Sequence, residues 1–176
     1  MDGSQNFPYR NPMENALNTR NGLLTLVMAV ATVAIGTALA SQYIGGLEPC
    51  KLCYWQRNPY YIAIPLLVAA LLFLRNQSSL MKIIAWLVLA IFFIGFGVSA
   101  YHVGVEQGWW SGPTSCSSSA SLGNSLDQQI DNLFNKPRVD CSKPAWTFFG
   151  ISMAGLNAIV SIFLIIGSFK AATARS

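Results

Sequence analysis

Charged residues are scarce in this chain, and long parts of it contain none. Only 10% of the 176 residues are Asp, Glu, Lys or Arg, against roughly 25% in a typical soluble domain. Four tracts carry no charge at all, at residues 21–47, 58–74, 83–101 and 144–169. With 53% hydrophobic residues as well, this composition indicates an integral membrane protein and argues against a soluble domain with a large core.

Several other signatures are also missing. The chain has a single histidine, and it contains no Rossmann fingerprint, no haem motif and no iron–sulfur spacing. It shows no internal repeat and no nucleic-acid signature, and its net charge of +4 is explained by basic residues beside the apolar tracts. The sequence therefore predicts no nucleic-acid partner.

The charge-free tracts are long enough to predict four membrane spans. A spanning helix needs about 20 mostly apolar residues, in a range of roughly 17 to 25. The second tract is marginal and holds Pro59 and Pro65, which membrane helices tolerate when neighbouring groups satisfy the freed carbonyls. We predict an all-α integral membrane protein, a four-transmembrane-helix bundle that forms one domain over residues 1–176. The predicted spans are about 23–44, 56–74, 83–102 and 147–169, with extracytoplasmic loops at about 45–55 and 103–146.

The first tract has a rival interpretation as a cleaved signal peptide. The segment ALA at residues 38–40 resembles a cleavage site. Its apolar region, at residues 23–40, is however longer than the roughly 7 to 15 residues of a signal peptide, and a polar leader precedes it. A permanent span is the better interpretation.

Parity and basic residues together predict the orientation. Four spans place both termini on one side and the first and third loops on the other, so all four cysteines share one face. Lys and Arg are about twice as dense in the terminal segments and the second loop as in the cysteine-bearing loops. The positive-inside rule then predicts cytoplasmic termini. The cysteines would face an extracytoplasmic compartment, where disulfides form and persist.

The four cysteines form two pairs, Cys50 with Cys53 in a C-x-x-C motif and Cys116 with Cys141 in the third loop. Static disulfides are plausible for the loop pair, but closing so short a loop as C-x-x-C removes little chain entropy. A four-thiolate zinc site is disfavoured because 24 residues separate the second pair, so we predict no metal. A redox-active C-x-x-C is the remaining reading, since a helix N-terminus and nearby cations stabilise the reactive thiolate.

Two further residues are candidates beside this motif. If the second helix begins before Cys53, Arg57 lies one turn further along the same face; if it begins at Pro59 with Asn58 as cap, only proximity remains. Arg57 could alternatively be a snorkelling anchor, and His102, which ends the third span, an interfacial residue. A dithiol at the bilayer edge can pass electrons to a lipid-soluble quinone, and Arg57 can donate hydrogen bonds to a quinone oxygen.

The motifs resemble one known family. PCKLCYWQR after the first span, a cysteine pair in the third loop and CSKPAWTFFG before the fourth span resemble the bacterial disulfide-bond-formation protein B (DsbB) family over most of the chain. The resemblance implies a thiol:quinone oxidoreductase of the bacterial inner membrane. It would reoxidise a periplasmic thioredoxin-fold thiol oxidase, DsbA, and pass the electrons to ubiquinone or menaquinone in the membrane pool.

The resemblance also implies a role for each candidate. The DsbA thiolate would attack a Cys116–Cys141 disulfide, with Cys116 carrying the mixed disulfide. Cys141 would then exchange with Cys50, and Cys53 would be the thiolate that faces the quinone, with Arg57 as its electrostatic partner.

His102 would match a histidine near the quinone in that family. Two alternatives stay open: a paralogue that serves a different, dedicated thiol partner, and a non-enzymatic four-helix membrane protein with structural disulfides. Vitamin K epoxide reductase-like proteins also combine four helices, a C-x-x-C and a quinone. The position of the motif in the first loop, ahead of a cysteine-bearing third loop, favours the DsbB family.

Overall fold

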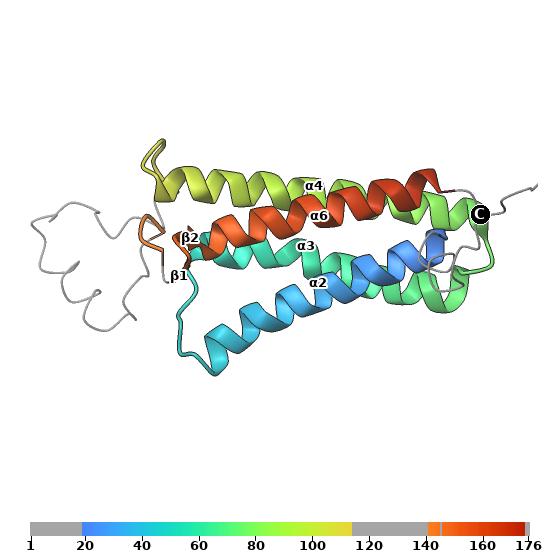
Figure 1. The fold of residues 1–176 in the computed structure, drawn as a ribbon, viewed down its shortest axis with the longest axis horizontal. Coiled ribbons are helices and arrows are strands. Elements are labelled where there is room, and N and C mark those ends of the chain that lie inside the picture. The colour runs from blue at the N-terminus through green and yellow to red at the C-terminus, as the bar shows by residue number, and fades with distance from the viewer. Residues whose placement is uncertain (1–18, 114–140, 145, 175–176) are drawn as a thin grey trace, which may run out of the picture.

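The computed structural model describes residues 19–113, 141–144 and 146–174. The long helices are α2 (Arg20–Tyr43), α3 (Lys51–Ala69) with its π-helical continuation η1 (Ala70–Leu74), α4 (Ser78–Glu106) and α6 (Met153–Thr173). All four are long and apolar enough to cross a membrane, and they lie side by side along one axis (Figure 1). The prediction of an all-helical, four-span protein is confirmed. Most of the predicted long loop, and Cys116 with it, lies outside the described residues.

Consecutive helices run in opposite directions and form a ring. α4 packs most extensively against α6, α6 also packs against α2, and α3 lies between α2 and α4. The ring order is therefore α2, α3, α4, α6, which is the up-and-down arrangement of a four-helix bundle. α2 diverges from the other helices toward its C-terminal end (Figure 1).

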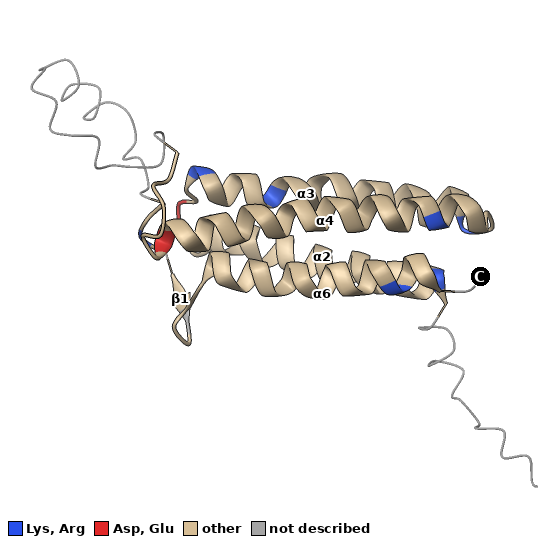
Figure 2. Cartoon of the chain, turned by 90° about the horizontal axis from the view of Figure 1, so that it is seen from above, with Lys and Arg blue, Asp and Glu red and all other residues tan. Residues whose placement is uncertain are grey.

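The bundle is apolar both inside and outside. Leu24, Phe92 and Leu164 are buried at its centre, while Val33 and Phe73 are 68% and 79% exposed on its surface. Charged residues gather at the two ends, with the middle free of charge except for a basic position on α3 (Figure 2). Such a band of exposed apolar side chains would be unfavourable in water and suits contact with lipid.

Arg20 closes the end of the bundle that lies opposite the cysteines. Its guanidinium is buried and donates to the carbonyl of Ser78 at 2.8 Å, that of Ala171 at 3.2 Å and that of Ala174 at 2.6 Å. Ala171 lies in the last turn of α6 and Ala174 is its C-cap, where backbone acceptors have no partner within the helix. One side chain thus ties α2 to α4 and α6.

The fourth helix begins later than the sequence indicates. The predicted span starts at residue 147, but β1 (Thr147–Phe148) and β2 (Ile151–Ser152) form a two-stranded antiparallel hairpin there. Phe149 and Gly150 have φ values of 50° and 81°, as the two central residues of a tight hairpin turn require. Ser152 then caps α6 by accepting from the backbone N–H of Gly155 at 3.1 Å.

The third helix continues past the predicted end at residue 102. It stops at Glu106, where the backbone N–H of Gly108 donates to Val105 at 3.1 Å and that of Trp109 donates to Gly104 at 2.9 Å. These two bonds form a Schellman motif, and Gly108 supplies its left-handed residue at a φ of 72°. The extra turn keeps His102 and Glu106 on one helical face.

Candidate redox site at the start of α3

Cys50 and Cys53 meet at the N-terminus of α3. Cys50 is the N-cap of the helix, and its Sγ accepts from the backbone N–H of Cys53 at 3.3 Å. Both residues are thiols, and their sulfur atoms are 3.0 Å apart, a hydrogen-bonding distance. The side chain of Cys50 thus replaces the oxygen that usually caps a helix, and both sulfurs lie at the positive end of the helix dipole.

This cap corrects the predicted start of the second helix. The sequence placed residues 45–55 in a loop and the start of the span at 56, but α3 begins at Lys51. The side chain of Cys50 satisfies one backbone donor of the first turn, and Pro59 and Pro65 are accommodated inside the helix. Arg57 therefore lies one helical turn beyond Cys53, as the first of the two geometries considered above requires.

Arg57 turns inward, toward α2. Its guanidinium donates to Oε1 of Gln42 at 2.5 Å and to the carbonyl of Ala38 at 3.2 Å, and it lies 5.5 Å from the ring centre of Tyr54. The side chain is only 8% exposed. Both hydrogen-bond acceptors are neutral, so these contacts hold the cation in place without cancelling its charge.

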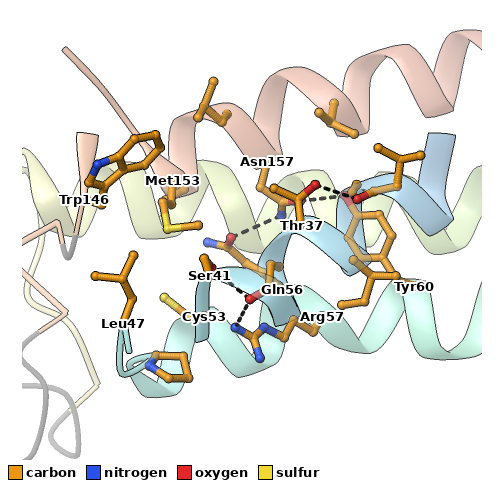
Figure 3. A pocket seen from close by; sticks show the side chains of 18 of the residues that line it. Thr37, Ser41, Leu47, Cys53, Gln56, Arg57, Tyr60, Trp146, Met153 and Asn157 are labelled. Carbon is orange, nitrogen blue, oxygen red and sulfur yellow. Dashed lines mark hydrogen bonds between the residues drawn. The ribbon is translucent and has the colours of Figure 1, made fainter. Parts of the chain in front are cut away.

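A cavity of about 570 Å³ lies between α2, α3 and α6. Its wall is mostly apolar, and Cys53 and Arg57 both line it, as Figure 3 shows. The cavity lining also contains a second set of polar side chains, those of Gln56, Tyr60 and Asn157. A volume in this range, with few polar groups in an apolar lining, is typical of a site for a small organic molecule.

The cavity reaches the outer surface of the bundle along α2. Val33 lines the cavity and is 68% exposed, and Val30, one turn before it, lines the cavity and is 37% exposed. A lipid-soluble molecule could therefore enter from the side, between helices.

Cys141 packs against the C-x-x-C motif. It is buried in one cluster with Cys50, Leu52 and Val105, and Cys53 packs against this cluster. Three of the four predicted cysteines thus lie together at one end of the bundle. Cys116 lies outside the described residues.

His102 approaches Cys50 from α4. Its Nε2 lies 3.6 Å from Sγ of Cys50 and 3.8 Å from Oε1 of Glu106, and its Nδ1 lies 2.7 Å from Nε2 of Gln56. His102 is buried and is not among the residues that line the cavity. That it binds a cofactor stays a prediction, since its described contacts are with the cysteine motif.

The two thiols of the motif are inequivalent. The hydrogen bond to Cys53, followed by burial, raises the pKa of the Cys50 thiol to about 12. Because two interacting thiols titrate as a pair, Cys50 is the thiol that keeps its proton to the higher pH in this arrangement. Cys53, the other sulfur of the pair, lines the cavity.

Comparison with known proteins agrees with this geometry. The family model described as disulfide bond formation protein DsbB matches residues 20–171. An uncharacterized protein of Rickettsia prowazekii is 33% identical over 84% of this chain and 85% of its own. A protein of Methylococcus capsulatus named disulfide bond formation protein B is 31% identical over 84% of this chain and 88% of its own length. A protein of the same name from an Acidovorax species is 29% identical over 78% of each chain.

The chain belongs to the DsbB family. The match covers all four helices and the cysteine motif. Membership places the chain among multi-pass membrane oxidoreductases of disulfide bond formation. No solved structure matches the chain.

In this DsbB-family chain, the structure groups the predicted residues into two neighbourhoods. Cys53 and Arg57 line the cavity, whereas Cys141 and His102 contact Cys50 on the other side of the motif. Sequence reasoning missed Gln56, Tyr60 and Asn157, which connect the two neighbourhoods by hydrogen bonds. A signal for one of them was present: Asn157 is a polar residue inside an apolar span, a position that is often functional.

The same sulfur atoms could also hold a metal ion. Ligand atoms of Cys50, Cys53 and His102 all lie within 4.8 Å of one another. Two thiolates and an imidazole suit a soft ion such as zinc. This set differs from the four-cysteine site weighed from the sequence, and a disulfide between Cys50 and Cys53 would abolish it.

Proposed function

We propose that this chain oxidises a periplasmic, thioredoxin-fold thiol protein of the DsbA type and passes the electrons to a membrane quinone. The observation that carries the proposal is that Cys53 and Arg57 line one apolar cavity that reaches the lipid-facing surface. A dithiol without an adjacent acceptor site would need no such cavity. The printed names of the relatives, disulfide bond formation protein B, support the thiol chemistry.

The residues of the cavity fit a quinone, either ubiquinone or menaquinone. A quinone presents carbonyl acceptors on a flat ring with an apolar tail, and the wall offers a guanidinium in an otherwise apolar lining. Arginine has five N–H donors, and the bonds to Gln42 and Ala38 use two of them. Arg57 can therefore donate to a carbonyl in the cavity without breaking its hydrogen bonds to α2. When bound, the quinone would supply the oxidising power by accepting two electrons and two protons.

The cysteines would move the electrons in two exchanges. The thiolate of the partner attacks Cys116 of a Cys116–Cys141 disulfide, which forms a mixed disulfide and releases the Cys141 thiolate. Cys141 then attacks Cys50 of the Cys50–Cys53 disulfide, so that a Cys50–Cys141 bond forms and Cys53 leaves as a thiolate beside Arg57. The packing of Cys141 against Cys50 supports the second exchange.

The orientation that goes with this function is the one predicted from the sequence. We propose that the protein lies in the bacterial inner membrane with cytoplasmic termini, so that the cysteine end faces the periplasm. The buried Arg20 clamp would then lie at the cytoplasmic end.

Quinone reduction tests the proposal. The purified chain in detergent is mixed with a reduced thioredoxin-fold donor, and quinone absorbance is followed. We expect turnover in the wild type and none in Cys53→Ser, because the acceptor-facing thiolate is lost. Absence of turnover with ubiquinone, menaquinone and several thiol donors would contradict the proposal and favour cysteines that are static disulfides.

A further inference from the structure

A chain of buried and partly buried hydrogen bonds crosses α3, α4 and α6 and ends at Cys50. It begins at Ser99, whose hydroxyl donates to the carbonyl of Gly95 at 2.9 Å. The oxygen of Ser99 is thus left to accept from Nδ2 of Asn157 at 2.7 Å. The amide oxygen of Asn157 must then face Tyr60, whose hydroxyl donates to it at 2.6 Å.

The orientation of Asn157 fixes that of Gln56. Nδ2 of Asn157 also donates to Oε1 of Gln56 at 3.2 Å. The amide nitrogen of Gln56 is therefore the atom that lies 2.7 Å from Nδ1 of His102. An amide N–H can only donate, and a neutral imidazole has one donor and one acceptor nitrogen. Nδ1 of His102 accepts, so its proton is on Nε2.

The Nε2–H of His102 faces the sulfur of Cys50 at 3.6 Å. The ionisable groups around that sulfur are Cys53 on α3, at 3.0 Å, and Cys141, which packs in the same cluster. Oε1 of Glu106 approaches the same ring nitrogen, but at 3.8 Å from Nε2 it lies beyond hydrogen-bonding distance. The imidazole N–H is therefore available to a negative charge on Cys50.

We propose that His102 is a catalytic residue that donates a hydrogen bond from Nε2 to the Cys50 thiolate, and that Gln56 is the positioning residue that holds it in the required tautomer. The inference rests on the proposed exchange between Cys141 and Cys50. It assigns His102 to the thiol-exchange side of the motif, whereas the cavity side belongs to Cys53 and Arg57.

The step that this contact assists is the departure of Cys50. After the second exchange, Cys50 is joined to Cys141 in a disulfide. An incoming thiolate attacks the sulfur of Cys141, a new disulfide to Cys141 forms, and the bond between Cys141 and Cys50 breaks. The electron pair of that bond leaves on Sγ of Cys50, where the N–H of His102 stabilises the thiolate. No proton is transferred, and the number of disulfides is unchanged.

Alkylation of single cysteines tests the assignment without quinone or partner. One full-length variant keeps only Cys50 (Cys53→Ala, Cys116→Ala, Cys141→Ala), and its control keeps only Cys53 (Cys50→Ala with the same two loop changes). The rate with iodoacetamide is measured against pH in detergent. The pH midpoint reports thiolate stability, whereas the plateau rate reports accessibility.

We expect His102→Leu to raise the pH midpoint of Cys50 by about one unit, the effect of losing one hydrogen bond to a charged group. The midpoint of Cys53 in the control should not move. His102→Gln keeps an N–H donor and should restore most of the shift. Gln56→Leu retains the imidazole but frees its tautomer, and should raise the Cys50 midpoint by about half as much.

The assignment is overturned if neither His102→Leu nor Gln56→Leu moves the Cys50 midpoint, or if both cysteines shift equally. The latter would indicate a general loosening of the bundle. Failure here with intact quinone turnover would remove only the role of His102. A shift of the Cys50 midpoint in a protein that never reduces quinone would instead refute the proposed function and leave the contact standing.

Discussion

Arg57 places a guanidinium inside the bundle, one turn from Cys53, and its hydrogen bonds go to neutral acceptors on α2. Burying a charge in this way costs free energy unless a negative charge or a hydrogen-bond acceptor compensates it. The thiolate of Cys53 and a carbonyl in the cavity are the two groups that would. Under the proposed function, Arg57 connects the chemistry of the cysteine to the recognition of the acceptor.

Arg57→Ala should lower kcat/KM for quinone by about tenfold or more, since a hydrogen bond to a charged group contributes about 1.5–3 kcal/mol. Quinone reduction with a saturating thiol donor measures this. Lys51→Ala is the matched control, because Lys51 is an exposed cation on the same helix and does not line the cavity. Equal losses in the two variants would mean that Arg57 acts only through net charge.

The raised pKa of Cys50 predicts a pH dependence of stability in the reduced protein. The thiol keeps its proton to about pH 12 in the folded state, against an ordinary value of 9.0. The folded state therefore binds the extra proton between these values. The contribution of Cys50 to the free energy of unfolding is fully present below about pH 9 and falls as the pH rises toward 12.

The measurement is the thermal unfolding midpoint of the reduced wild type and of Cys50→Ala, from about pH 8 to about pH 11. As the pH rises, the unfolding midpoint of the wild type should fall relative to that of Cys50→Ala. Groups that do not interact with Cys50 or Cys53 titrate alike in both proteins and cancel, so the difference reports the titration of this pair. A difference that stays constant over the range would contradict the raised pKa.

At the scale of the helices, Gly95 sets how closely α4 approaches α3. A Cβ at this position would lie 2.9 Å from Cγ and 3.2 Å from Cβ of Pro59. The ring of Pro59 is rigid and cannot move aside as a flexible side chain would. Pro59, which the sequence offered as an alternative start of this helix, is thus the residue against which Gly95 of α4 packs.

Gly95→Ala should destabilise the bundle by about 1–3 kcal/mol, the usual cost of overpacking. Gly97→Ala is the control two residues away, because a Cβ there meets nothing within 4 Å, and it should be neutral or stabilise by up to about 1 kcal/mol through helix propensity. Thermal unfolding in detergent compares the two. Equal effects of both substitutions would rule out the contact with Pro59.

The helices show what the sequence can and cannot predict. Charge-free tracts located all four spans because a membrane core tolerates few charges. Helix ends were less accurate, because they depend on single atoms: Sγ of Cys50 caps α3, and the Phe149–Gly150 turn delays α6. The Phe149–Gly150 turn lies inside the charge-free tract 144–169, whereas the start of α3 lies in a charged segment whose composition is typical of a loop.

Only the part of the candidate site that is local in sequence was predictable. The C-x-x-C spacing and Arg57 are local in sequence, so their proximity follows from one helical turn. The contacts of Cys50 with His102 and Cys141 join residues that are 52 and 91 positions away along the chain, and only helix packing decides them. Gln56 reads as an ordinary polar residue until its partners on α4 and α6 are seen.

At the scale of the whole molecule, orientation decides which compartment the cysteines meet. The positive-inside rule predicts cytoplasmic termini, and the proposed function requires the same. Lys51 and Gln77 are both exposed, and they lie in the described structure at opposite ends of α3 and η1.

In a variant without native cysteines, Lys51→Cys should react with a membrane-impermeant maleimide on cells whose outer membrane alone is permeabilised. Gln77→Cys should react only after the inner membrane is opened as well, because the loop that contains it would face the cytoplasm. Labelling is read by a mass shift on a gel. The reverse pattern would contradict the orientation and, with it, a periplasmic thiol partner.

The burial of Cys141 beside Cys50 has a kinetic consequence. Two sulfurs that are already held together react at an effective molarity far above any concentration of a free thiol. Under the proposed relay, the internal exchange would then be independent of how much partner protein is present. Only the first encounter, at Cys116, would respond to partner supply, so the rate would rise with partner concentration and level off where the internal steps take over.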